Sequence, residues 1–122
     1  MKSILFIISF LFGIGCFSQQ QLPDSLNTAN KRANILTKRM VSELNLTDYQ
    51  LPKVDSLNLV YAIKMDVKVI KTSKSNWSKY WKTQQIMNEK EVFLRRILNK
   101  EQLKKYKKMR SKAMNSILRN AF

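Results

Sequence analysis

Hydrophobic residues recur every three or four positions along most of the chain, which is the spacing of amphipathic helices. The first stripe predicts a helix over residues 24–44, and the second predicts a helix over residues 48–71, before the polar stretch TSKSN. Two more helices are expected over residues 76–98 and 100–119. No segment from Gln19 onward alternates hydrophobic and polar residues as an exposed strand does. The sequence therefore predicts an all-α protein, with four helices in a thin, extended antiparallel hairpin or bundle arrangement.

The third predicted helix carries hydrophobic residues on two sides. One stripe runs through its length and is interrupted by two polar residues, Gln84 and Glu91. A second stripe, at Ile86, Phe93 and Ile97, predicts that the later half of this helix is covered on two faces. A small four-helix monomer has limited interior to cover so many faces, so we expect a homodimer.

One six-residue pattern occurs twice, as LTDYQL at residues 46–51 and as LNKEQL at residues 98–103. In each copy a capping residue is followed three positions later by glutamine, the spacing of a capping box. The flanking leucines stand at the positions of a hydrophobic staple. We expect each copy to start a helix and to close a sharp corner without glycine. The residues of the two copies are Leu46, Thr47, Gln50 and Leu51, then Leu98, Asn99, Gln102 and Leu103.

The first 18 residues have the layout of a secretory signal peptide. A basic residue precedes an apolar run from Ile4 to Phe12, and small residues follow. We place cleavage after Ser18, which leaves residues 19–122 as a single helical domain. Alternatively, Cys16 becomes the lipid-bearing first residue of the exported protein. In both cases we expect an exported, periplasmic protein, either free or lipid-anchored at Cys16.

Composition restricts the chemistry that the exported chain could perform. The sequence has no histidine, and its two glycines and one cysteine all lie in the first 18 residues. Cleavage after Ser18 therefore leaves no thiol nucleophile, no imidazole base and no glycine-rich phosphate loop. The eight carboxylates are scattered along the chain, which does not favour a metal site. We expect no enzymatic activity, no metal and no cofactor.

The chain is strongly basic, with 23 Lys and Arg against 8 Asp and Glu and a formal net charge of +15. Lysines concentrate on one side of the fourth predicted helix, and such a surface attracts acidic partners. The aromatic sequence WSKYW adds apolar surface: we expect Trp77 and Tyr80 in the core or a dimer seam, and Trp81 exposed. The candidate contacts for a protein partner are Trp81, Arg95, Lys104, Lys105, Lys108 and Lys112.

Two stretches, LNLTDYQ (Leu44 to Gln50) and ILNKEQLKKY (Ile97 to Tyr106), resemble the paired LTxxQ motifs of the Spy/CpxP family of bacterial periplasmic proteins. The second copy has Asn99 where the family has threonine, but asparagine also caps helices well. The resemblance implies an ATP-independent chaperone or an adaptor in envelope stress sensing. It also implies a thin, curved helical dimer whose concave surface receives partly folded proteins. The motif glutamines would then act in the fold and not in an active site.

Two functional hypotheses follow. In the first, the protein binds unfolded or partly folded envelope proteins through a basic, partly apolar surface. In the second, it is a structural or membrane-surface protein, lipidated at Cys16 in one version, that binds anionic lipid, lipopolysaccharide or an acidic envelope protein. Nucleic acid would also suit the positive charge, but the export signal disfavours it.

Overall fold

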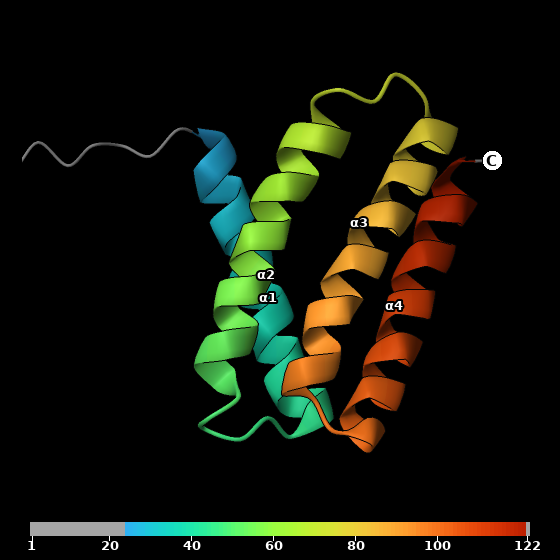
Figure 1. Ribbon diagram of the computed structural model, residues 1–122. Coiled ribbons are helices and arrows are strands. Elements are labelled where there is room, and N and C mark those ends of the chain that lie inside the picture. The colour runs from blue at the N-terminus through green and yellow to red at the C-terminus, as the bar shows by residue number, and fades with distance from the viewer. Residues whose placement is uncertain (1–23, 122) are drawn as a thin grey trace, which may run out of the picture.

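A computed structural model describes residues 24–121, which form an antiparallel bundle of four α-helices (Figure 1). The helices are α1 (Asp24–Leu44), α2 (Leu51–Met65), α3 (Asn76–Ile97) and α4 (Lys100–Ala121), and a π-helical segment, η1 (Asp66–Ile70), continues α2. No strand occurs in residues 24–121. The predicted all-α, four-helix fold is therefore confirmed, while the signal peptide, the cleavage site and Cys16 lie outside the described residues.

The bundle consists of two helical hairpins packed side by side. α1 and α2 form one hairpin, α3 and α4 form the other, and each has its short corner at the lower end in Figure 1. The connection between α2 and α3 lies at the opposite end. Since both corners contain a copy of the doubled hexamer, the fold brings the two copies to the same end of the molecule.

The α2 helix begins three residues later than predicted. Pro52 has no backbone N–H to bond the Asp48 carbonyl, so regular α-helical bonding cannot start there. A helical turn still precedes α2, because the Leu51 N–H donates to the Thr47 carbonyl at 3.0 Å. At its other end α2 widens into η1, where the Lys71 N–H reaches the Asp66 carbonyl at 3.1 Å.

The hydrophobic core is largest near the two corners. All four helices contribute to it, and its seven buried members are Met40, Leu44, Val54, Leu94, Leu98, Tyr106 and Met109. A smaller cluster of Tyr61, Val69 and Ile86 lies between α2, η1 and α3. Each fully buried side chain of this size contributes about 1.5–3 kcal/mol through removal from water.

The interior farther from the corners is more polar. Arg32 on α1 forms an ion pair with Asp66, and Asn58 on α2 donates to Thr37 Oγ1 at 2.9 Å. Asn58, Asp66 and Lys90 are all buried, as is Glu91. The bundle is therefore held together by apolar packing at one end and by polar contacts in its middle.

Candidate binding surface

Both predicted capping boxes are present. In the first, the Thr47 N–H donates to Gln50 Oε1 at 3.0 Å and the Gln50 N–H donates to Thr47 Oγ1 at 3.2 Å. In the second, the Asn99 N–H donates to Gln102 Oε1 at 3.0 Å and the Gln102 N–H donates to Asn99 Oδ1 at 2.8 Å. Each copy of the hexamer thus starts a helix, as the sequence predicts.

The two motif glutamines also bond to each other. Gln50 Nε2 donates to Gln102 Oε1 at 2.8 Å, and Gln102 Nε2 donates to Gln50 Oε1 at 2.9 Å. Each amide also bonds the end of a helix in the other hairpin: Gln50 Nε2 reaches the Ile97 carbonyl at 2.9 Å, and Gln102 Nε2 reaches the Leu44 carbonyl at 3.2 Å. The two corners therefore cap each other, a link that no spacing in the sequence predicts.

The corners differ in how they turn and in how their leucines pack. Asn45, just after α1, has a φ of 52°, so asparagine takes the left-handed position often given to glycine. Leu46, Leu98 and Leu103 pack against the main core. Leu51 is 37% exposed, so the first predicted staple buries less apolar surface than the second. This glycine-free end of the bundle is a rigid polar joint with a structural role.

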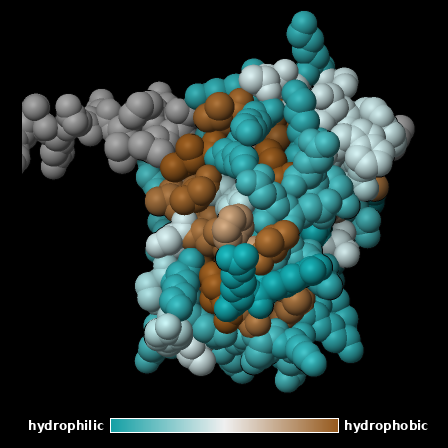
Figure 2. Space-filling model, in the orientation of Figure 1, coloured by the Kyte–Doolittle hydropathy of each residue, from teal (hydrophilic) through white to brown (hydrophobic). Residues whose placement is uncertain are grey.

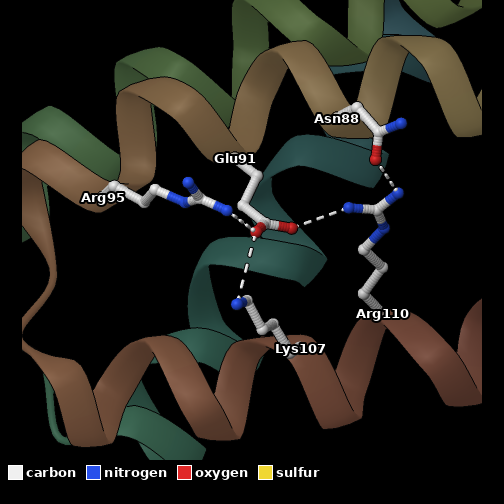
Figure 3. A network of polar contacts seen from close by, with 5 residues as sticks. All are labelled: Asn88, Glu91, Arg95, Lys107 and Arg110. Carbon is white, nitrogen blue, oxygen red and sulfur yellow. Dashed lines mark hydrogen bonds and ion pairs between the residues drawn. The ribbon is translucent and has the colours of Figure 1, made fainter.

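A second polar cluster, built around Glu91, joins α3 to α4 (Figure 3). Glu91 accepts from Arg95 Nη2 at 3.0 Å and from Arg110 Nη1 at 2.7 Å, and Lys107 Nζ lies 3.7 Å from its carboxylate. Arg110 also donates to Asn88. Burial alone would raise the pKa of Glu91, but the hydrogen bonds from Arg95 and Arg110 outweigh it and lower the pKa. Glu91, one of the two polar residues that interrupt the predicted stripe, is thus a carboxylate bound by three cations between α3 and α4.

The structure does not gather the predicted contact residues into one site. The four lysines Lys104, Lys105, Lys108 and Lys112 are all exposed on α4, as predicted. Arg95 is engaged by Glu91. Trp81 precedes Arg95 by 14 residues on α3, which is about 21 Å along a helix. The lysine face and the tryptophan are therefore separate features of the surface.

The aromatic residues at the start of α3 form a compact exposed cluster. The ring centroids of Trp77 and Tyr80 are 5.9 Å apart, and Trp81 lies 5.5 Å from each of them. Trp81 is 50% exposed, as predicted, but Trp77 is 54% exposed and does not fill the core of the monomer. The core alternative for Trp77 is therefore wrong, because no helix of the described bundle covers this side of the α3 N-terminus.

A groove between α2 and α3 is the main surface feature that the sequence does not predict. Its wider part has a volume of about 630 Å³ and is formed by Leu57 and Val60 on α2 and by Phe93 and Ile97 on α3. Lys53 and Arg96 stand at its margins. Figure 2 shows hydrophobic atoms gathered on this face, interrupted by hydrophilic ones. Phe93, predicted to be covered, is 43% exposed here, whereas Ile86 of the same stripe is buried.

A second hollow of about 530 Å³ continues along the same two helices toward the α2–α3 connection. Val67 and Ile86 contribute apolar surface to it, and Lys68 and Lys82 contribute charge. Lys64 and Glu89 both line this second hollow, where Lys64 Nζ bonds both oxygens of Glu89 at 2.5 and 2.6 Å and links α2 to α3. We call the two hollows together the α2–α3 groove. It follows about 30 Å of α2 and its continuation.

Among the described residues, no group of three or more Asp, Glu, His or Cys side chains could hold a metal ion. No described helix combines the length and the hydrophobicity that crossing a membrane requires. No curated protein and no solved structure matches the chain. The profile of one family, described as "Domain of unknown function (DUF4890)", matches residues 18–106, more than half of the chain. The chain therefore belongs to the DUF4890 family.

Proposed function

We propose that the protein is an ATP-independent, chaperone-like protein of the bacterial envelope that binds unfolded or partly folded proteins. The α2–α3 groove is the observation that carries this proposal. It is long and open, the hollow beside Leu57 and Ile97 is lined mainly by apolar side chains, and the groove exposes Val60, Val67 and Phe93 to solvent. Apolar surface of this kind on a helical bundle suits an extended or helical segment of another chain.

The charges around the groove support transient binding. Lys53, Lys68 and Lys82 contribute to its margins, together with Arg96. Positive charge attracts acidic segments of a non-native chain over about 8–10 Å at physiological salt, while the apolar walls act only on contact. Because the Lys64–Glu89 ion pair occupies part of the second hollow, each hollow can contact only a short apolar stretch of a client chain, and such short contacts dissociate readily. No nucleotide is needed for such capture and release.

Two further observations from the sequence support the same proposal. The doubled motif resembles the LTxxQ pairs of the Spy/CpxP family, and the N-terminal layout is typical of export. The lysine face of α4, with Lys104, Lys105, Lys108 and Lys112, together with Arg95 and exposed Trp81, supplies additional candidate contacts for clients.

An aggregation assay without ATP tests the proposal. Protein purified from cells that export it should, at equimolar amounts or below, slow the aggregation of several reduced or chemically unfolded clients. Val60→Ser with Phe93→Ser should weaken this effect, because both substitutions remove apolar contacts inside the groove. Ile35→Ser is the matched control, since Ile35 is an exposed apolar residue on α1, outside the groove, with 67% of its surface accessible.

The assay has two outcomes that contradict the proposal. One is that the wild-type protein leaves the aggregation of all the clients unchanged. The other is that Ile35→Ser weakens the effect as much as the groove substitutions do, which would mean that exposed apolar surface in general, and not the groove, is responsible.

The lysine face of α4 favours one alternative function: attachment to an anionic membrane surface, with or without a lipid on Cys16. Lys104, Lys108 and Lys112 recur every four residues and form one exposed column. Such a column binds anionic lipid or lipopolysaccharide by charge. Sedimentation with anionic vesicles at low salt tests this alternative, and replacing the three lysines with glutamine should abolish the binding. An absence of wild-type binding would rule it out.

A further inference from the structure

A pocket inside the bundle carries an inference that is independent of the proposed chaperone function. It lies between α1, α2 and α3, shares Ile86 with the α2–α3 groove, and has a volume of about 230 Å³. Leu36, Tyr61, Met65 and Ile86 provide apolar walls. Three polar residues, Arg32, Asn58 and Lys90, also line it.

Lys90 is a buried cation without a partner among the described residues. Only 5% of its surface is exposed, and its ammonium forms no hydrogen bond or ion pair with the described side chains, those of residues 27–119. Six of the seven carboxylates from Glu43 onward are engaged by other side chains, for example Asp66 by Arg32 and Glu89 by Lys64. Burial lowers the pKa of Lys90 to about 8, and no neighbouring carboxylate opposes this shift.

The charges that line the pocket do not balance. Arg32 also lines it, but its guanidinium is neutralised by Asp66 and bonds the Ala62 carbonyl at 3.3 Å. The Lys90 charge is left without compensation, and an unpaired buried charge is costly. An anion in this pocket would supply the missing partner.

Asn58 provides a second unsatisfied polar group. Its amide Nδ2 donates to Thr37 Oγ1 at 2.9 Å, and Thr37 in turn donates to Asp55 Oδ1 at 3.0 Å, which fixes the orientation of the amide. The Asn58 Oδ1 atom is buried and has no hydrogen-bond donor among the described residues. Buried side-chain oxygens are rarely left in this state. A bound molecule with a hydroxyl or N–H group would satisfy it.

We propose that this pocket binds a small organic acid with an apolar body, whose carboxylate pairs with the Lys90 ammonium while its hydrocarbon part contacts Leu36, Met65 and Ile86. Sites for drug-sized molecules measure about 300–1,000 Å³, so this smaller pocket suits a short aliphatic or single-ring acid. An acid that also carries a hydroxyl group should bind more tightly, because Asn58 Oδ1 can accept from it.

Octanoate and 1-octanol are suitable probes, since they share a hydrocarbon chain and differ in charge. Isothermal titration should show one octanoate per chain in the wild-type protein. Lys90→Met keeps a long side chain without the charge and should bind octanoate about ten- to a hundred-fold more weakly, while binding octanol as the wild type does. Lys38→Met, which removes an exposed lysine on α1, should leave both affinities unchanged.

A second measurement uses only the wild-type protein and so does not depend on the folding of a variant. In protein with ¹⁵N-labelled lysine, octanoate should shift the side-chain nitrogen signal of Lys90 and raise its pKa, while octanol should not raise it. Equal octanoate affinities for the wild type and Lys90→Met would overturn the inference. The absence of any octanoate binding to the wild type would overturn it as well.

Discussion

The side-chain amides of Gln50 and Gln102 donate to each other, at 2.8 and 2.9 Å, although 52 residues separate them in the chain. Each amide oxygen also accepts from the N–H of its own capping residue, and each amide nitrogen also donates to a helix-ending carbonyl of the other hairpin. All four hydrogen-bonding positions of each amide are therefore occupied. The two copies of the hexamer together form one hydrogen-bonded joint between the two hairpins.

We expect Gln102→Ala to lower the free energy of unfolding by about 1–3 kcal/mol, because it leaves several buried polar groups without partners. Gln50→Ala should also lower the free energy of unfolding, but by less, since Gln50 is only partly buried. Urea denaturation measures both, and Gln85→Ala, which replaces an exposed glutamine on α3, serves as the control. The double variant should lose less than the sum of the two single losses, because the shared bonds are lost only once. If the double variant instead loses the full sum of the two single losses, the two glutamines do not act as one joint.

The Glu91 cluster should make stability depend on pH in the acid range. The folded-state pKa of Glu91 is lowered, so its contribution is fully present above the usual carboxyl range and is lost as pH falls through the lowered value. Glu91→Gln should therefore cost about 2 kcal/mol at neutral pH, and the difference from the wild type should shrink on acidification. Thermal unfolding of both proteins at several pH values measures this. Glu43→Gln, in an exposed pair with Arg39, should change little. A difference that stays constant down to strong acid would contradict the prediction.

Burial of the Lys90 charge should destabilise the protein at neutral pH, and this cost should disappear in the alkaline range. The folded-state pKa of Lys90 is about 8 against 10.5 for an ordinary lysine, so above pH 8 the unfolded chain holds more protons than the folded one and stability rises with pH. The full shift corresponds to about 3 kcal/mol. Lys90→Met should be more stable than the wild type at pH 7, by an amount that narrows toward pH 10. Burial raises the pKa of Tyr106 to about 12, but this contribution is common to both proteins and cancels in the comparison. A destabilised Lys90→Met at pH 7 would contradict the prediction.

We expect the protein to form a homodimer, with Trp77 in the seam. The monomer leaves the Trp77, Tyr80 and Trp81 cluster largely uncovered, and a second copy would remove this apolar surface from water. Light scattering at micromolar concentration should give twice the monomer mass, and Trp77→Ser should shift the equilibrium toward monomer. The matched control is Ile35→Ser, which should remain dimeric. A wild-type protein that is monomeric under these conditions would contradict the prediction.

The fold could be predicted from the sequence because its signals are local. Stripes at helical spacing and two capping boxes depend on residues three or four positions apart, and these fixed the four helices to within a few residues. The later start of α2 also has a local cause, since Pro52 interrupts the first turn. The widening into η1 has no comparable signal in the sequence.

The candidate site could be predicted only in part, because it depends on contacts between distant residues. The exposure of Trp81 and of the α4 lysines follows from their positions on amphipathic helices. The pairing of Gln50 with Gln102 and the α2–α3 groove depend on how the two hairpins pack. Lys90 gave one usable signal: it lies four residues after Ile86 and four before Leu94, on the buried side of α3. A charged residue at such a position indicates either an internal partner or a ligand.

The position of the glutamine joint at one end of the bundle has a dynamic consequence. Exchange of backbone amide hydrogens should be slowest beside Leu44 and Gln102 and fastest in the last turn of α4. The end of the bundle that contains the two corners should therefore open less often than the opposite end. We expect local opening to begin at this second end, where the α2–α3 connection and the small cluster of Tyr61, Val69 and Ile86 still link the two hairpins. Such local opening would admit a small molecule toward Lys90 without global unfolding, and it would let the α2–α3 groove adjust its width to different polypeptides.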